Sequence, residues 1–485
     1  MNEEQLIALF DGCEDVIFSR LEMGTGTSVT SALMIYSEGL CDMNQLNEYI
    51  FPALRRLADQ RKQPTLSAIE RAVARPVQIL DGVHDELDIV EQVFDGQLII
   101  FWEHLNLVMS IHASHHPQRS PDEPNTEISI RGPKDGFIEQ INVNIGLIRR
   151  RLRTNSLHCE KFVIGARSHT RIALMYINDV ASQTLVESVR EQLSGISIDA
   201  IISATNIEEH LVKRSFSLFP LVAYTGRPDY AVSCLVSGRC LVLVDGAPTI
   251  LIAPANFTFL LSSAEDSHSF FYFVWLERML RFLGFVVAVF LPGFWVALTT
   301  YHQDQIPFTL LATVVIARQG IPLPAPLEAL LIIILFELFK EAGLRLPLAV
   351  GQTLSVVGGL IIGQAAISAG LASSVMLVVV AASTVATFTF TSQSIVGSMA
   401  IIRFFVLFLA SGLGMFGFLL ALLAIITYMS NLKSFGTSYL APFSPVIKSD
   451  LFRAFFTVPT RYLNLRPKLL QPLDQTRKKG SDSGS

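Results

Sequence analysis

The chain has 485 residues, 51% of them hydrophobic, and a positive mean hydropathy, a composition that excludes an ordinary soluble enzyme. Residues 1–270 hold 22 Lys and Arg against 34 Asp and Glu, residues 271–432 hold 6 against 5, and residues 433–485 hold 9 against 3. These counts indicate an acidic front region, a nearly uncharged middle and a basic tail. The five cysteines are scattered and form no CxxC pair, so a reducing compartment fits better than a disulfide framework or a zinc module.

The first 115 residues predict a mixed α/β lobe. Residues 28–36 have the composition of a strand, residues 42–62 that of a helix, and residues 96–111 that of two strands around a tight polar turn. The start, MNEEQLIALFDGCEDV, lacks a basic segment followed by an apolar core, so no cleavable signal peptide is visible. We therefore expect the front region to stay in the cytoplasm, with a later apolar segment acting as the membrane signal.

A second α/β lobe is predicted for residues 127–265, after a linker at residues 116–126 that is rich in proline and charge. The apolar runs EKFVIGA and TRIALMYI predict strands, and a helix is expected from Ala181 to Leu193. CLVLVDGAPTILIA predicts a hairpin, because Asp-Gly is favoured in two-residue turns. No repeat of fixed period is visible, and the N-terminal part is expected to be an α+β region of two lobes.

Residues 271–432 predict a transmembrane helical domain of about 4–6 spans, since roughly 20 apolar residues cross a bilayer core. Arg278 and Arg281 precede the first span, and basic residues near a span favour the cytoplasmic side. The basic tail, residues 433–485, is expected on the same side. The candidate spans are residues 282–300, 324–343, 348–369, 374–391 and the long run 399–430, while residues 305–317 are a shorter re-entrant or interfacial block.

The run 399–430 allows two interpretations. Arg403 and the basic tail are both expected on the cytoplasmic side, and a single crossing between them would separate the two. A hairpin of two short or tilted helices, broken at SGLGMFG, satisfies both expectations. The alternative is one long tilted helix with a different number of spans upstream.

Ionisable residues cluster in IPLPAPLEALLIIILFELFKEAGLRLP, residues 321–347. A carboxylate in the middle of a membrane helix costs about 2.5–3.5 kcal/mol, so such groups face protein, a partner or water. Glu337 and Glu341 share a helix face, Lys340 is placed to pair with Glu337, and Glu328 lies on roughly the opposite side. Glu328, Glu337 and Glu341 are candidates for an ion path or gate, and the alternative is a helix end that reaches the interface with local pairing.

The segment VGQTLSVVGGLIIGQAAISAG, residues 350–370, combines small residues with two glutamines. Small residues let membrane helices approach closely, which makes Gly358, Gly359 and Gly363 candidates for helix packing. Gln352 and Gln364 are candidates for the ion path, and ordinary packing within one bundle is the alternative. The hydroxyls of STVATFTFTSQS, residues 383–394, line a wet cavity or bond back to their own helix.

Catalytic and cofactor motifs are not found. The chain has no P-loop, no GxSxG elbow and no HExxH, and HASHHP at residues 112–117 is interpreted as a solvated loop rather than a metal site. The chain is therefore predicted not to be an enzyme, and no cofactor, metal or nucleic acid is expected.

Several long segments, in order, resemble the A subunits of the GerA-type nutrient germinant receptors of endospore-forming bacteria. The resemblance covers about residues 127–467 and, loosely, the first lobe. It is carried by IRGPKDGFIEQINVNIGLIRRRL, FVIGARSHTRIALMYI, FPLVAYTGRPDYAVSCLVSGRCLVLVDGAPTILIAPANF, LPGFWVALTTYHQDQIPFTLL, FELFKEAGLRLPLAVGQTLSVVGGLIIGQAAISAG and LKSFGTSYLAP.

The resemblance implies an integral subunit of the spore inner membrane with its N-terminal domain in the cytoplasm. It implies a transporter-like B subunit and a lipoprotein C subunit as partners, membrane lipid around the helices, and a homo-oligomer that forms a ligand-gated channel for monovalent cations. Arg227 and Asp229 of YTGRPD are candidates for coupling the cytoplasmic lobes to the membrane part. A non-conducting scaffold and a secondary transporter are the alternatives.

Two positions depart from the pattern of the family. Family members commonly have Glu where Gly226 stands in YTGRPD, and many have Glu where Gln319 stands in ARQG. Both departures remove a carboxylate, which raises the question of how active this chain is in a receptor.

Overall fold

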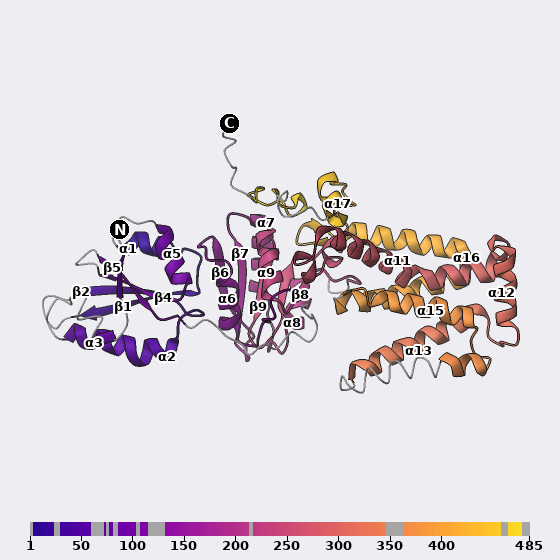
Figure 1. Ribbon diagram of the computed structural model, residues 1–485, viewed down its shortest axis with the longest axis horizontal. Helices are drawn as coiled ribbons and strands as arrows, with labels where there is room; N and C mark the ends of the chain where they lie inside the picture. The colour runs from indigo at the N-terminus through magenta and orange to yellow at the C-terminus, as the bar shows by residue number, and fades with distance from the viewer. Residues whose placement is uncertain are drawn as a thin grey trace.

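The computed structural model places two α/β lobes and a helical part in a row along its longest axis (Figure 1). The first lobe holds the N-terminus, the second lobe lies in the middle, and the long helices extend from it to the far end. The structure describes residues 3–23, 30–59, 72–73, 77–80, 86–102, 107–114, 131–212, 217–345, 363–390, 392–456 and 464–477.

The first lobe is built on a five-stranded antiparallel sheet in the order β1-β2-β4-β5-β3. One apolar core lies between the sheet and α1 and α5, and a second lies between the sheet and the helices α2 and α3. Helices therefore cover both faces. The elements are α1 Glu3–Ala8, β1 Val16–Met23, β2 Thr30–Ser37, α2 Met43–Gln45, the π-turn η1 Leu46–Ile50, α3 Phe51–Asp59, β3 Val77–Leu80, α5 Glu86–Phe94, β4 Gln97–Trp102 and β5 Leu107–His112.

The second lobe repeats this architecture with a sheet in the order β6-β7-β9-β10-β8. Helices α7 and α8 cover one face, while α6 and α9 cover the other. The elements are α6 Ile141–Arg149, β6 Leu157–Ile164, β7 Thr170–Ile177, α7 Gln183–Ser194, α8 Ala204–Leu211, β8 Ala223–Thr225, α9 Pro228–Val236, β9 Cys240–Val244, β10 Ile250–Ala253, α10 Phe257–Leu260 and the 3-10 turn η3 Ala264–Ser267.

The two lobes share one topology. In each lobe a helix precedes two hairpin strands, helices lead to an edge strand, and a further helix leads to the last two strands. The sequence showed no repeat of fixed period, because the repetition lies in the order and pairing of elements rather than in residue spacing. The two-lobe α+β prediction is confirmed for the described residues, but the internal duplication of topology was missed.

The predicted hairpin around Asp245 forms, but the prediction of a two-residue turn was wrong. Leu251 pairs with Val242, and five residues, 245–249, connect the two strands. The Asp245 carboxylate accepts a hydrogen bond from the backbone N–H of Ile141 and pairs with Arg171. Through these two contacts of Asp245, the five-residue turn connects the hairpin to the start of α6 and to β7.

A buried ion pair joins the two lobes. The Arg149 guanidinium at the end of α6 donates to both carboxylate oxygens of Asp15, at 2.6 and 2.7 Å, and lies 4.3 Å from the centre of the Phe94 ring. Its remaining nitrogen donates to the backbone carbonyl of Thr154. Backbone hydrogen bonds between residues 12–14 and Cys159 continue the contact onto the edge of β6. The lobes are therefore joined by a desolvated, specific interface.

The helical part is built around α11, which packs against α15 and α16 (Figure 1). Two helical segments of the described chain, Phe271–Tyr301 and Ser394–Asn431, are long and apolar enough to cross a membrane. The elements are α11 Phe271–Tyr301, the 3-10 turn η4 Gln303–Gln305, α12 Phe308–Arg318, α13 Ala325–Arg345, α15 Ser374–Thr387, α16 Gln393–Asn431, β11 Lys433–Ser434, β12 Thr437–Ser438, α17 Lys448–Phe455 and the 3-10 turn η6 Lys468–Leu470.

The chain reverses direction within α16. Gly414 has non-helical angles of φ 62° and ψ −139°. Val406 before it lies against Gly293, and Phe418 after it packs on Phe294 with ring centres 5.5 Å apart. Both arms therefore lie beside the same turn of α11, which matches the hairpin interpretation of the run 399–430. At about 1.5 Å per residue the arms 393–413 and 415–431 are roughly 30 and 25 Å long.

Gly414→Ala is expected to destabilise this reversal by about 1–3 kcal/mol, because a side chain is strained at these backbone angles. A Cβ at Gly414 would also lie 2.9 Å from the Tyr301 ring. Gly412→Ala is the matched control, since a Cβ there meets nothing within 4 Å and alanine favours a helix. Unfolding of the full chain in detergent measures both, and equal stability of the two variants would contradict the strained turn.

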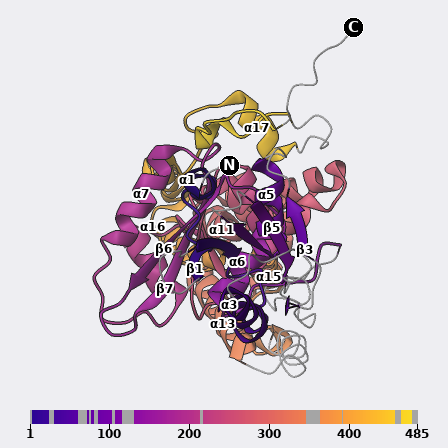
Figure 2. The same ribbon diagram turned by 90° about the vertical axis from the view of Figure 1, so that its left-hand side faces the viewer.

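One apolar core runs from the second lobe into the helical part. It contains Leu241 of the lobe, Ala288 of α11, Met399 and Ile425 of the two α16 arms, and Tyr439 beyond α16. The basic tail then docks back on the lobe, where the backbone N–H of Leu473 donates to the carbonyl of Val180. In Figure 2, viewed along the long axis, α17 and the tail lie at the periphery of the molecule. The expected linker, residues 116–126, falls outside the described residues.

Candidate functional site

A buried polar centre lies in the middle of the helical part, beside Pro292 of α11. Proline has no N–H, so a carbonyl one turn earlier, that of Ala288, loses its helical donor. The Arg403 guanidinium Nε donates to this carbonyl at 2.8 Å, and the Ser383 hydroxyl donates to it at 2.9 Å. Three helices, α11, α15 and α16, thus meet at one released carbonyl, which is how apolar helices tolerate an internal proline.

Glu337 of α13 supplies the counter-charge for this centre. Its carboxylate lies 3.5 Å from an Arg403 nitrogen and 2.5 Å from the ammonium of Lys340, so the predicted pairing of Lys340 with Glu337 is confirmed. Arg403 is fully buried, whereas Glu337 and Lys340 are partly exposed. Arg403, which was expected on the cytoplasmic side, lies halfway along the first arm of α16, and its side of the membrane remains a prediction.

Glu328 lies apart from this centre, near the start of α13. One carboxylate oxygen accepts hydrogen bonds from the backbone N–H and the hydroxyl of Ser373, which caps α15, and Arg318 of α12 lies 3.6 Å from the other oxygen. The side chain is fully buried. Glu328 therefore ties three helix ends together, and its assignment to an ion path remains a prediction.

The other membrane candidates are spread over several surfaces. Glu341 and Gln364 are exposed, and Gly363 is buried where an added Cβ would lie 3.3 Å from Leu377 of α15. The close approach at Gly363 is the geometry expected of a packing glycine. Gln352, Gly358 and Gly359 lie outside the described residues.

The hydroxyl-rich segment mainly bonds to its own backbone. Thr384 donates to the carbonyl of Val380, Thr387 to that of Thr384, and Thr389 to that of Ala386. Among the described hydroxyls of this segment, that of Ser383 bonds to another helix. The geometry therefore favours helix-internal bonding over a wet cavity in this segment.

Arg227 and Asp229 form a charge cluster at the N-terminus of α9, where the second lobe meets the helical part. The Arg227 guanidinium is almost fully buried and forms a two-point pair with Asp229 and a further pair with Glu265. His268 lies 2.7 Å from Asp229. Burial by itself raises the pKa of Asp229, but hydrogen bonds from Arg227 and His268 outweigh it and hold that pKa below its ordinary value.

The cluster continues into the first turns of α11. Asp266, next to Glu265 in η3, accepts from Arg278 at 2.8 Å and from Arg281 at 2.9 Å. Arg278 also donates to the backbone carbonyl of Arg453, at the end of α17. Two sets of ion pairs, joined by the neighbouring residues Glu265 and Asp266, thus connect α9 of the lobe with α11, and a hydrogen bond to a backbone carbonyl extends the contact to the tail.

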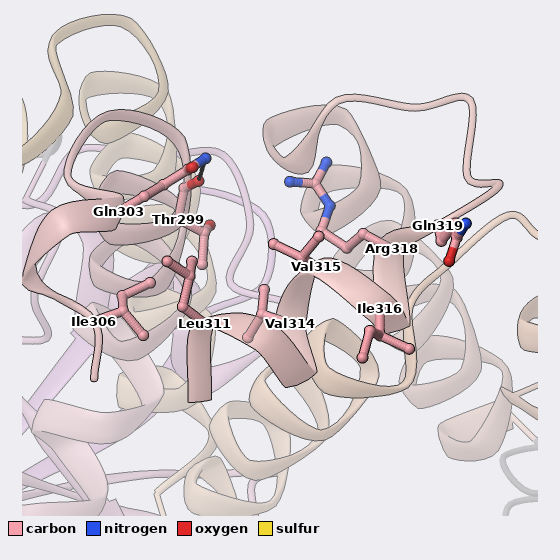
Figure 3. Close-up of a pocket in the computed structure, with 9 residues that line it drawn as sticks. All are labelled: Thr299, Gln303, Ile306, Leu311, Val314, Val315, Ile316, Arg318 and Gln319. Atoms are coloured by element: carbon pink, nitrogen blue, oxygen red, sulfur yellow. Dashed lines mark hydrogen bonds between the residues drawn. The ribbon is translucent and has the colours of Figure 1, made fainter. Parts of the chain in front are cut away.

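A cavity of about 430 Å³ lies between the end of α11, η4 and α12 (Figure 3). Gln319, one of the two departures from the family pattern, lines it as the C-cap residue of α12. The negative end of the helix dipole disfavours a carboxylate there, so glutamine suits this position locally. The lining residues are Thr299, Gln303, Ile306, Leu311, Val314, Val315, Ile316, Arg318 and Gln319.

Sequence reasoning missed the centre of the site. Arg403 and Ser383 were not among the candidate residues, and Pro292 drew no attention. The available signal was a lone arginine inside an apolar run together with a proline inside a predicted span, since each leaves a polar group that needs a partner in lipid.

Comparison with known proteins decides the family. The family model of the Bacillus/Clostridium GerA spore germination proteins matches residues 4–469. The chain belongs to the GerA family. The family resemblance predicted from the sequence motifs is therefore confirmed, over a longer stretch than predicted.

Two relatives of this GerA-family chain are spore germination proteins that match it over most of their length. Spore germination protein XA of Bacillus anthracis is 44% identical over 99% of this chain and 97% of that protein. Spore germination protein KA of Bacillus subtilis is 34% identical over 96% of this chain and 85% of that protein. The crystal structure of the N-terminal domain of the A subunit of the Bacillus megaterium germinant receptor GerK3 matches 52% of this chain and 93% of that domain, with 26% identity and a TM-score of 0.40.

Proposed function

We propose that the chain is the A subunit of a nutrient germinant receptor and oligomerises into a ligand-gated path for monovalent cations in the spore inner membrane. Membership of the GerA family carries this proposal. A transporter-like B subunit and a lipoprotein C subunit are its proposed partners. Residues 271–432 form the proposed membrane domain, with the two lobes and the tail in the cytoplasm.

Contacts of the chain support this topology. The second arm of α16 returns to the second lobe, where the Tyr428 hydroxyl accepts from the backbone N–H of Leu218. The segment that follows α16 bonds to the same lobe, since the side chain of Asn256 donates to the carbonyl of Ala441. These contacts support a lobe and a tail on the same side of the membrane, which an even number of crossings provides.

The proposed cation path passes the partly exposed carboxylate of Glu337. The carboxylate stays partly exposed beside its pairs with Lys340 and Arg403, and a carboxylate at the surface of a pore favours cations, while the buried Arg403 behind it holds the helix in place. The charge cluster from Asp229 to Arg281 is the proposed route by which movement of the lobes reaches α11. Alternating ion pairs of this kind change partners when two elements shift, so they suit a coupling element.

Potassium flux from liposomes that contain the purified full chain tests the conducting role. We expect the unmodified chain to release potassium, Glu337→Gln to lower the rate several-fold, and Glu341→Gln, one turn further along, to change it less. Rates are compared at equal amounts of folded protein.

The double variant Glu337→Gln with Arg403→Met separates the role of the Glu337 carboxylate in cation flux from its role in stabilising the helical part. If Glu337 serves the cation path, the double variant regains stability but not flux, because the carboxylate is still missing. Recovery of flux in the double variant would assign Glu337 a purely structural task. Absence of flux from the unmodified chain would favour a non-conducting scaffold.

A further inference from the structure

A second cavity, of about 490 Å³, lies where the second lobe, the start of α11 and the tail meet. Among the described residues that line it are four arginines, Arg239, Arg278, Arg453 and Arg477, and one carboxylate, that of Asp266. A volume of this size suits a small ligand. The lining also contains serine hydroxyls from three segments, including those of Ser237, Ser262 and Ser267, which supply further hydrogen-bonding groups.

The positive charge of this cavity is not balanced by its carboxylate. Asp266 is already paired with Arg278 and with Arg281, a further arginine outside the lining set. Arg239 and Arg453 donate to neutral oxygens, the Asn256 amide and the backbone carbonyl of Leu465 respectively. The cavity therefore has an excess of positive charge close to buried surface, where charge is costly without a counter-ion.

Arg477 gives the strongest indication of an anion-binding site. Its guanidinium donates to the Ser237 hydroxyl at 3.0 Å, but its buried Nε has no hydrogen-bond partner among the described residues. Burial lowers the pKa of Arg477, and the positive charges of Arg466 and Arg453 lower it further. A bound oxyanion would supply the acceptor and oppose this repulsion, and guanidinium groups match phosphate oxygens in a two-point geometry.

Exposed aromatic side chains lie on the same end of α11. Phe270 and Phe271 line the cavity, and Tyr272 and Trp275 beside them are also exposed. Tyrosine and tryptophan side chains such as these two gather at the boundary between lipid headgroups and acyl chains. The cavity thus lies at the level where the apolar part of α11 begins, within reach of a headgroup.

We propose that this cavity binds the phosphate group of an anionic phospholipid, with Arg453 and Arg477 as its main ligands and the acyl chains along the aromatic face of α11. The site is distinct from the proposed cation path. It links the lobe, α11 and the tail, so a bound lipid holds these three segments together.

Binding of soluble short-chain lipid to the purified full chain in neutral detergent tests the proposal. Dioctanoyl phosphatidylglycerol is titrated while thermal unfolding is followed, with dioctanoyl phosphatidylcholine and inorganic phosphate as separate arms. We expect the anionic lipid to raise the unfolding temperature and Arg453→Gln with Arg477→Gln to weaken its apparent affinity at least tenfold, since hydrogen bonds to charged groups are lost. Arg167→Gln, on the exposed surface of the second lobe, is the control and should leave the affinity unchanged.

The arms distinguish the source of the phosphate. Stabilisation by inorganic phosphate that the double variant abolishes supports the phosphate site and assigns it to the free ion instead of the lipid. Equal binding of the neutral and anionic lipids, unaffected by the double variant, overturns the proposal. If the double variant fails to fold, added salt provides the test on the unmodified chain, because binding that survives high salt undiminished would contradict a site built on charge.

Discussion

Glu337→Gln is expected to destabilise the helical part by about 3 kcal/mol. The substitution leaves the Arg403 guanidinium fully buried and without the carboxylate that lies 3.5 Å away. Arg403→Met should cost only about 1 kcal/mol, because Ser383 still donates to the Ala288 carbonyl and Glu337 keeps Lys340 as its partner. Detergent-based unfolding of the full chain measures both values.

The double variant provides the decisive comparison. If the two residues interact as described, Glu337→Gln with Arg403→Met should be less destabilised than Glu337→Gln alone, since the uncompensated charge has gone. Ser383→Ala in the Arg403→Met background then removes the last donor to the Ala288 carbonyl and should cost a further 1–3 kcal/mol or so. Additive losses throughout the series would show that these groups do not act as one centre.

Asp15→Asn is expected to loosen the joint between the lobes by about 3 kcal/mol, because it removes one partner of a buried ion pair. The expected readout is roughly a hundredfold loss of amide hydrogen-exchange protection in α6 and in the segment before β1. Asp199→Asn is the matched control. Its pair with Arg167 is exposed, with side-chain exposures of 66% and 82%, and an exposed pair contributes about 0–1 kcal/mol.

The location of the loss matters as much as its size. Protection within β9, in the centre of the second sheet, should stay near that of the unmodified chain. A uniform loss across both lobes would show that Asp15 supports the fold as a whole rather than the joint. No change at α6 would contradict the structural role of the pair.

Local patterns predicted much of the fold. Alternating and continuous apolar runs identified β2, β4, β5, β6, β7, β9 and β10, and the glycine-containing SGLGMFG identified the reversal of α16. Each of these signals lies within a few residues of the element that it predicts. The prediction of a two-residue turn after β9 was wrong because no such local signal decides it. The Asp245 side chain bonds to Ile141, more than a hundred positions earlier.

The parts that sequence reasoning missed depend on distant partners. Asp15 and Arg149 are 134 positions apart, and Arg403 reaches a carbonyl 115 positions before it. An arginine at either place has the same local appearance as one that faces water or marks a membrane boundary. Pairings of this kind become visible only when the fold brings the elements together.

The core shared by the second lobe and the long helices has a consequence for biosynthesis. A ribosome releases the strands of the second lobe long before Ile425 and Tyr439, yet these late residues pack in the same core. The lobe therefore cannot bury its α6 and α9 face fully until nearly the whole chain has been made and α16 has folded back. Truncations within α16 should consequently expose the apolar surface of the lobe that Ile425 and Tyr439 cover in the full chain.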